Sequence, residues 1–314
     1  LALGNSVIVK PSSGAPFSAI LIAEALHEAG FPPGSVNVLT GPGDVVGEDL
    51  VSSPGVDAVN FFGQDKTGEI IAGKAALKKL LFAIVSSNAL IVMDDANIEE
   101  AVNAALGGCY GHNGQSPIST RRILVHQNVH KQFTDLFTEK TKALVFGDPL
   151  DPKTDVGPVN NTKVLEITMA LVEDARRKGA RFLTGGNNPQ GLYIEPTVID
   201  DVTPDMVITQ EVTMGPVAAV MTFGSIDEAV ELANSTRFGF QVGAFTSGLA
   251  NAYYLAENIR AGSIYINEAT SCWDEMAPFG GAKRSGVGRM LSDWIFNELS
   301  EIKMVMFDLG KVKK

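Results

Sequence analysis

Short apolar segments alternate with segments of helical periodicity along almost the whole chain. Residues 6–11 form a β-branched run that stops at a proline, residues 16–29 carry apolar side chains at helical spacing, and residues 36–40 form the next apolar run. A β-branched run bounded by breakers is typical of a buried parallel strand. Strands separated by helices of about 10–15 residues need crossover connections, which indicates an α/β fold with a parallel sheet and helices on both faces.

The pattern restarts after the apolar run at residues 89–93, which divides the chain into two α/β units and a tail. We predict residues 1–85 for the first unit, 86–298 for the second and 299–314 for the tail. The apolar, strand-like segment at residues 301–309 has no local partner that could bury it. Further strands are expected at 58–62, 122–126, 180–184, 217–223, 242–246 and 262–266, and helices at 44–52, 66–76, 97–107, 129–143, 163–178, 226–235 and 250–259.

The charge and the cysteine content disfavour several classes of protein. The formal net charge of −11 over 314 residues argues against nucleic acid as a partner, because phosphate binding needs clustered Lys and Arg. Cys109 and Cys272 lie far apart without metal-ligand spacing, so we expect neither a metal site nor a disulfide framework, and a cytoplasmic location. No apolar run reaches the ~18 residues that a membrane span needs. Residue 1 leads directly into a strand pattern without a basic leader, and we expect it to be an internal point of a longer ancestral domain.

Many short motifs follow one another in a fixed order from about residue 5 to residue 306. They include Lys10-Pro11-Ser12, Gly41-Pro42-Gly43, Asp155-Val156-Gly157-Pro158, Gly215-Pro216-Val217 and Pro278-Phe279-Gly280-Gly281. In this order they resemble the C-terminal two thirds of an aldehyde dehydrogenase. The resemblance implies a Rossmann-type coenzyme domain, partial here at residues 1–85, an α/β catalytic domain at 86–298 and an oligomerisation strand in the tail. It also implies NAD or NADP as coenzyme, a small or aromatic aldehyde as substrate, and a homo-oligomer.

Lys10, Ser13 and Gly41 fall on coenzyme-binding positions of the family. The resemblance assigns the Lys10 ammonium to the adenosine ribose. Ser13 stands where members that prefer NAD often have a glutamate, whose carboxylate bonds the ribose hydroxyls and repels a 2′-phosphate. Serine removes that repulsion, so we expect NADP to be tolerated. In the alternative interpretation, Lys10 and Ser13 are only solvated residues at a strand end.

The turn that faces the coenzyme phosphates departs from the family pattern. Gly63-Gln64-Asp65 replaces a Gly-Ser-Thr sequence. Gly63 still permits close approach of the backbone, but Gln64 replaces a hydroxyl and Asp65 adds a carboxylate. A carboxylate near a phosphate costs on the order of 1 kcal/mol at water-like screening. Val212 replaces the carboxylate that the family uses on the nicotinamide ribose, although Glu211 is adjacent, so we expect weak coenzyme binding or none.

Both reacting groups of the family are replaced. Pro117 stands where the family has its catalytic cysteine, and Ala83 stands where it has its general-base glutamate. Proline offers neither a nucleophile nor a backbone N–H for an oxyanion, and alanine cannot accept a proton. The family's N-terminal part, with its oxyanion-hole asparagine, has no counterpart. Because the scaffold motifs are intact, we expect a fold that was kept while its oxidative chemistry was lost or replaced.

Other side chains near the former centre are candidates for chemistry. Cys272 falls in a stretch that lines the aldehyde pocket in the family. Ser116 and Ser119 flank the proline, and His112 is the histidine best placed to act as a base. Each also has a structural interpretation, as an apolar pocket residue, loop hydrogen-bonders and a helix-end histidine respectively. Besides an impaired oxidoreductase, two functions therefore stay open: a hydrolase that cleaves small esters with a Ser or Cys nucleophile, and a non-catalytic binding or assembly protein.

Overall fold

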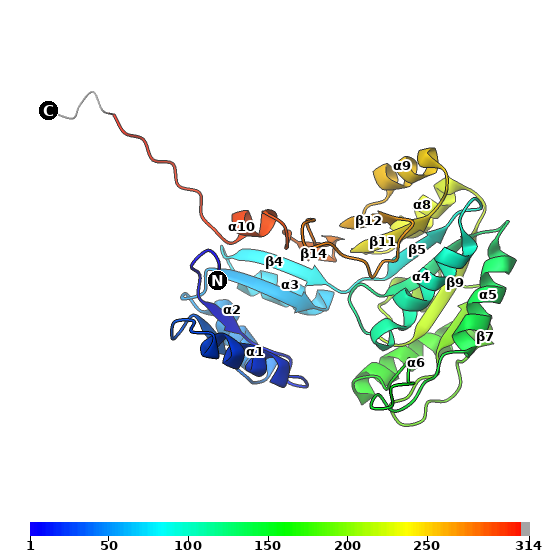
Figure 1. Cartoon of the computed structure of the whole chain (residues 1–314), viewed down its shortest axis with the longest axis horizontal. Coiled ribbons are helices and arrows are strands. Elements are labelled where there is room, and N and C mark those ends of the chain that lie inside the picture. The colour runs from blue at the N-terminus through cyan, green and yellow to red at the C-terminus, as the bar shows by residue number, and fades with distance from the viewer. Residues whose placement is uncertain (309–314) are drawn as a thin grey trace.

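The computed structural model describes residues 1–308 and has two lobes of unequal size (Figure 1). The smaller lobe contains the first part of the chain together with β14 (Gly286–Val287) and α10 (Trp294–Glu298). The larger lobe is a seven-stranded sheet covered by helices. The fold is α/β with a parallel core, as the alternating sequence pattern predicts.

The strands of the smaller lobe form two separate sheets. β1 (Val7–Val9) is parallel to β2 (Val36–Val38), and β3 (Ala58–Gly63) is parallel to β4 (Lys79–Ile84), which pairs on its other edge with antiparallel β14. Parallel strands were expected, but alternation of strands and helices carries no information on which strand edges meet. The helices are α1 (Phe17–Glu28), a π-helical turn η1 (Gly43–Gly47), α2 (Glu48–Ser52) and α3 (Asp65–Lys74).

The larger lobe is organised around one continuous sheet. Its strands are β5 (Asn88–Val92), β6 (Thr120–His126), β7 (Arg181–Thr184), β8 (Thr197–Asp200), β9 (Val217–Phe223), β11 (Gln241–Phe245) and β12 (Ser263–Ile266). The spatial order is β12-β11-β5-β6-β9-β8-β7, and only the edge strand β7 is antiparallel to its neighbour. The other elements are α4 (Ile98–Tyr110), η2 (Gly111–Gly114), α5 (His130–Lys142), α6 (Thr162–Arg177), α7 (Val207–Gln210), α8 (Ile226–Asn234), α9 (Leu249–Asn258) and the antiparallel pair β10 (Phe238–Gly239) and β13 (Ala282–Lys283).

The core of the larger lobe lies on both faces of β5. Leu90 packs in the cluster that contains α4 and α5, whereas Ile91 packs in the cluster that contains α6, α8 and α9. Successive side chains of a strand point to opposite faces, so helices on both sides require an uninterrupted apolar strand. The helix α4 begins where the sequence offers caps: the Asn97 side chain accepts a hydrogen bond from the backbone N–H of Glu100.

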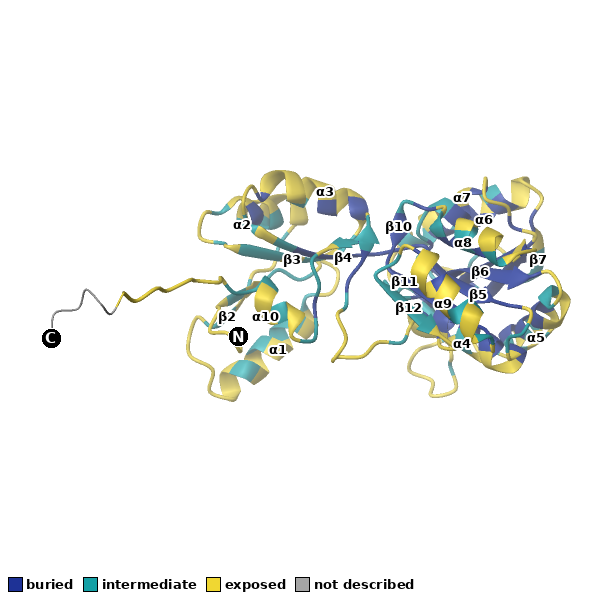
Figure 2. Ribbon diagram, turned by 90° about the horizontal axis from the view of Figure 1, so that it is seen from above, coloured by how far each residue is buried: buried dark blue, intermediate teal, exposed yellow. Residues whose placement is uncertain are grey.

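The smaller lobe and the tail are much more exposed than the larger lobe (Figure 2). α1 has no buried residue, and its Phe17, Leu21 and Ile22 face solvent. Residues 301–307 are extended and exposed, and they form no strand ladder in the described part of the chain. The last residue of the strand predicted at 301–309, like the end of the tail, lies outside the described residues. No helix within residues 1–308 is long and apolar enough to cross a membrane.

Candidate functional site

The loop that carries Pro117 runs from the end of α4 to the start of β6. In η2 the chain passes through left-handed conformations at His112 and Asn113, with φ of 50° and 58°. Gly114 is required by close packing, because a Cβ there would lie 2.1 Å from the carbonyl oxygen of Gly215. His112 is exposed, and within residues 1–308 its ring makes no hydrogen bond. His112 therefore lies exposed at a helix end, and its role as a base stays a prediction.

Arg121 fixes this loop from inside the larger lobe. Its guanidinium donates to the carbonyl oxygens of Ser116 at 2.9 Å, Ser119 at 2.7 Å and Thr213 at 2.6 Å. Burial lowers the pKa of Arg121 to about 10, because the cation loses its water and these hydrogen bonds go to neutral carbonyl oxygens. Arg121 was not predicted as a site residue, because its only signal in the sequence is an arginine pair at the start of an apolar run. The loop is thus held by its carbonyl groups, which point toward a buried cation.

Ala83 lies in the core and not at the surface of a cleft. It sits in β4 opposite Gly286 with 1% of its surface exposed, and it packs with Leu81, Phe240 and Met290. A methyl group at this position has no contact with water. The position therefore supplies no proton acceptor, and nearby space is filled by apolar side chains.

Cys272 has the surroundings of a pocket residue. It is half-buried, and burial together with the nearby carboxylates of Glu268 and Asp274 raises the pKa of its thiol. The next residue, Trp273, packs edge-on against Phe279 with ring centroids 5.9 Å apart. These surroundings favour the neutral thiol over the thiolate that nucleophilic attack requires.

The side chain of Thr270 ties the Cys272 loop to the Ser116 loop. The Thr270 hydroxyl donates to the carbonyl oxygen of Ile118 at 2.8 Å and contacts the Thr120 hydroxyl at the same distance. The Ser116 hydroxyl accepts a hydrogen bond from the backbone of Ile118 at 3.4 Å. Within the described residues, no hydrogen bond joins Cys272, Ser116 or His112 to one another. The loops are adjacent, but their candidate nucleophiles and base are not assembled into a catalytic unit.

Ser13 and Gly41 line one cavity of about 230 Å³ in the smaller lobe. The cavity lies where β1 and β2 end, and in parallel α/β sheets ligands bind beyond the carboxyl ends of the strands. The Ser13 hydroxyl donates to the carbonyl oxygen of Gly41 at 3.0 Å, and the neighbouring Lys10 ammonium donates to that of Pro11 at 2.8 Å. Its lining residues are Pro11, Ser12, Ser13, Pro16, Thr40, Gly41 and Pro42.

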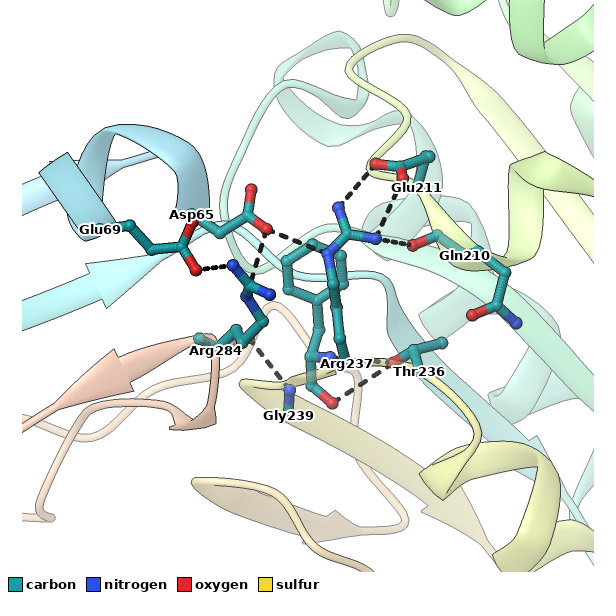
Figure 3. A network of polar contacts seen from close by, with 10 residues as sticks. Asp65, Glu69, Gln210, Glu211, Thr236, Arg237, Gly239 and Arg284 are labelled. Carbon is teal, nitrogen blue, oxygen red and sulfur yellow. Dashed lines mark hydrogen bonds and ion pairs between the residues drawn. The ribbon is translucent and has the colours of Figure 1, made fainter.

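Gly63 and Gln64 lead into α3, whose first residue belongs to a charged cluster (Figure 3). The Asp65 carboxylate is 8% exposed and accepts a hydrogen bond from Arg237 Nε at 3.0 Å. Arg237 also donates to both carboxylate oxygens of Glu211, at 3.0 and 2.7 Å, and these bonds raise the pKa of its guanidinium. Glu211, the carboxylate beside Val212, is therefore engaged by an arginine and not free for a ribose.

The candidate coenzyme-binding residues fit the adenosine end of a dinucleotide but not its diphosphate. The cavity at Ser13 and Gly41 is lined by hydroxyl groups suited to an adenosine ribose, and the Lys10 ammonium group lies beside it on the carbonyl oxygen of Pro11. At the start of α3, where a pyrophosphate would lie, a buried carboxylate stands in its place. No group of three or more His, Cys, Asp or Glu side chains that could hold a metal ion occurs between residues 1 and 308.

The sequence profile of the aldehyde dehydrogenase family matches residues 1–305. This chain belongs to the aldehyde dehydrogenase family. It is 38% identical over 319 residues to a betaine aldehyde dehydrogenase of Agrobacterium fabrum, with 99% of this chain and 64% of that enzyme covered. It is 35% identical over 309 residues to a 3-sulfolactaldehyde dehydrogenase of Priestia megaterium, with coverages of 98% and 65%. The chain thus spans 64–65% of the length of these two relatives.

Solved aldehyde dehydrogenase structures share the fold. The chain superposes on the NAD-dependent aldehyde dehydrogenase of Sinorhizobium meliloti with a TM-score of 0.95 and 35% identity, covering 98% of this chain and 62% of that one. It matches the glyceraldehyde-3-phosphate dehydrogenase of Methanocaldococcus jannaschii, solved with NADP, with a TM-score of 0.91 and 35% identity, covering 96% and 66%. These neighbours use or bind NAD or NADP, which confirms the family and the fold predicted from the sequence motifs.

Proposed function

We propose that this aldehyde dehydrogenase-family chain does not oxidise aldehydes by the family's thiolate route. The observation that carries the proposal is Pro117 at the nucleophile position, in a loop whose carbonyl groups bond to the buried Arg121. Ala83 supports it, because the position of the general base is filled by a core methyl group. Neither residue can form a covalent adduct with an aldehyde or remove a proton from water.

The coenzyme and substrate follow from the family. A small or aromatic aldehyde is the ligand class that we propose, and bound NAD or NADP would serve as hydride acceptor once a thiol and a general base are restored. We expect NADP to bind as well as NAD, because Ser13 places a neutral hydroxyl, and not a carboxylate, close to a 2′-phosphate. Lys10, Ser13 and Gly41 would hold the adenosine ribose, while Gly63 and Gln64 would face the phosphates.

The test measures reduced coenzyme formed from NAD or NADP with small and aromatic aldehydes. The wild-type rate should be undetectable, far below the usual range of ~1–1000 per second. The double variant Pro117→Cys with Ala83→Glu should recover activity only if the coenzyme binds, whereas Pro117→Ala, which removes the proline without adding a thiol, should recover none. An ordinary rate for the wild type would refute the proposal.

Assembly is the second function that a specific observation favours. The exposed apolar tail and the exposed face of α1 are surfaces that a second copy of this chain would cover, so we propose a homo-oligomer.

Hydrolysis of small esters stays a prediction, to be measured with an activated ester. Cytoplasmic location also stays a prediction. It is compatible with Cys109 and Cys272, which are both free thiols.

A further inference from the structure

The start of α3 is supplied with an anion by the chain itself. The N-terminus of a helix carries partial positive charge and unpaired N–H groups, which normally favour an external phosphate or carboxylate. In α3 the first residue is Asp65, and its carboxylate is nearly fully buried there. The preceding Gln64 makes no capping hydrogen bond with its side chain. A ligand phosphate at this helix start would therefore have to approach the buried carboxylate of the first helical residue.

Two arginines neutralise that carboxylate, and each also forms an ion pair with a second carboxylate. Arg237 lies outside the helix, on the segment before β10. The central carbon of its guanidinium lies over the Phe238 ring, 4.3 Å from the ring centroid. Besides Asp65 it holds Glu211 with two hydrogen bonds and the carbonyl oxygen of Gln210 with a third, at 3.1 Å (Figure 3). These bonds and the one to Asp65 use four of the five N–H groups of this guanidinium.

Arg284 completes the cluster from the short connection between β13 and β14. Its guanidinium lies 3.8 Å from the Asp65 carboxylate and forms an ion pair with Glu69, one helical turn further along α3. Three carboxylates thus face two guanidinium groups, and the cluster has no excess positive charge for a phosphate. Drawing either arginine toward a ligand would leave Asp65 buried and less compensated, which is strongly unfavourable for a buried charge.

We propose that Asp65, Arg237 and Glu211 close the start of α3 to a coenzyme diphosphate, so that this chain binds adenosine but gains no affinity from the diphosphate and nicotinamide of NAD. This rests on the proposed function in one respect, the assignment of the cavity at Ser13 and Gly41 to the adenosine end. The closure also joins the lobes, because Asp65 belongs to the smaller lobe whereas Glu211 follows α7 of the larger one. The cluster therefore determines which part of the family's coenzyme is accepted.

Calorimetry on the full chain tests the closure with adenosine and NAD as probes. For the wild type the two dissociation constants should agree within about threefold. Asp65→Asn keeps the shape and removes the charge, and Glu211→Gln weakens the hold on Arg237. Each should raise NAD affinity about five- to tenfold, since one unit charge near a phosphate is removed, and leave adenosine affinity unchanged. Glu48→Gln is the matched control, because it removes a carboxylate of the same lobe that pairs with Lys74 outside the cluster.

Three results would overturn the closure: NAD binding more than about tenfold tighter than adenosine in the wild type, no gain in either variant, or no adenosine binding at all. If Asp65→Asn does not fold, as judged by thermal melting, Glu211→Gln decides, because the Glu211 side chain is only half-buried. Tight NAD binding without aldehyde oxidation would refute the closure alone. Aldehyde oxidation with equal affinities for NAD and adenosine would refute the proposed function alone.

Discussion

At the residue scale, Cys272 illustrates how surroundings decide whether a thiol is reactive. An activated cysteine lies beside a cation, a histidine or a helix N-terminus that favours the thiolate. Cys272 is instead half-buried near Glu268 and Asp274, and these surroundings raise its pKa. At neutral pH the thiolate fraction is then smaller than in an ordinary cysteine, and it increases only as the pH rises toward the raised pKa.

We therefore expect Cys272 to react with iodoacetamide more slowly than free cysteine at neutral pH, with a rate that increases with pH. Mass spectrometry of the alkylated protein measures the reaction at each pH, and N-acetylcysteine in the same solution is the reference. Cys109 provides an internal control, since it is fully buried and should not react in the folded protein. A Cys272 thiol that reacts faster than the reference at neutral pH would contradict this expectation and support the hydrolase prediction.

What the sequence can predict at this scale depends on how local the contacts are. Ser13 and Gly41 come from motifs at the ends of neighbouring strands, and they do line one cavity. Arg237 is 172 residues away from Asp65, and no local pattern indicates that the two side chains meet. The roles of Ser116 and His112 also could not be predicted, because hydrogen bonding depends on loop conformation and not on spacing.

At the scale of elements, β5 and α1 represent opposite extremes of burial. Ile91 in β5 is completely buried between the sheet and the helices on one face, whereas Ile22 in α1 is 62% exposed. Removing buried methylene groups loses both transfer free energy and packing, so the same substitution should have different effects in the two elements.

We expect Ile91→Ala to lower the free energy of unfolding by about 2–5 kcal/mol. Its matched control, Ile22→Ala, should change it by no more than about 0.5 kcal/mol, because the side chain is already in contact with water. Urea denaturation followed by circular dichroism measures both. A comparable loss in the control would mean that α1 is covered in solution, for example by a second copy of this chain.

The long, periodic elements were predictable, and the short ones were not. The strand expected at 122–126 is part of β6, and the helix expected at 163–178 corresponds to α6. β8 was missed because its four residues follow a proline-containing motif without a distinct apolar run. β10 and β13 have two residues each, and such a pairing arises from tertiary contacts between distant segments. No sequence pattern of a few residues specifies it.

At the scale of the whole molecule, the tail and the smaller lobe leave much apolar surface in water. Ile302 is 92% exposed, and Met304, Val305, Met306 and Phe307 are also exposed. Contiguous apolar surface and an unpaired extended segment are usually covered in the functional state of a soluble protein. An extended segment can pair with a strand edge of another copy, and the two unconnected sheets of the smaller lobe offer such edges.

We expect the full chain to be a dimer or larger at micromolar concentration and the double variant Met304→Lys with Phe307→Lys to be largely monomeric. Lysine on an edge opposes strand pairing because its ammonium group would have to lose water. Leu77→Lys is the matched control: Leu77 is also a fully exposed apolar residue, but it lies in the turn before β4, so its replacement should leave the assembly intact. Light scattering after size-exclusion chromatography distinguishes the species. A full chain that is monomeric throughout this concentration range would contradict the assembly proposal, and the exposed tail would then need a different partner.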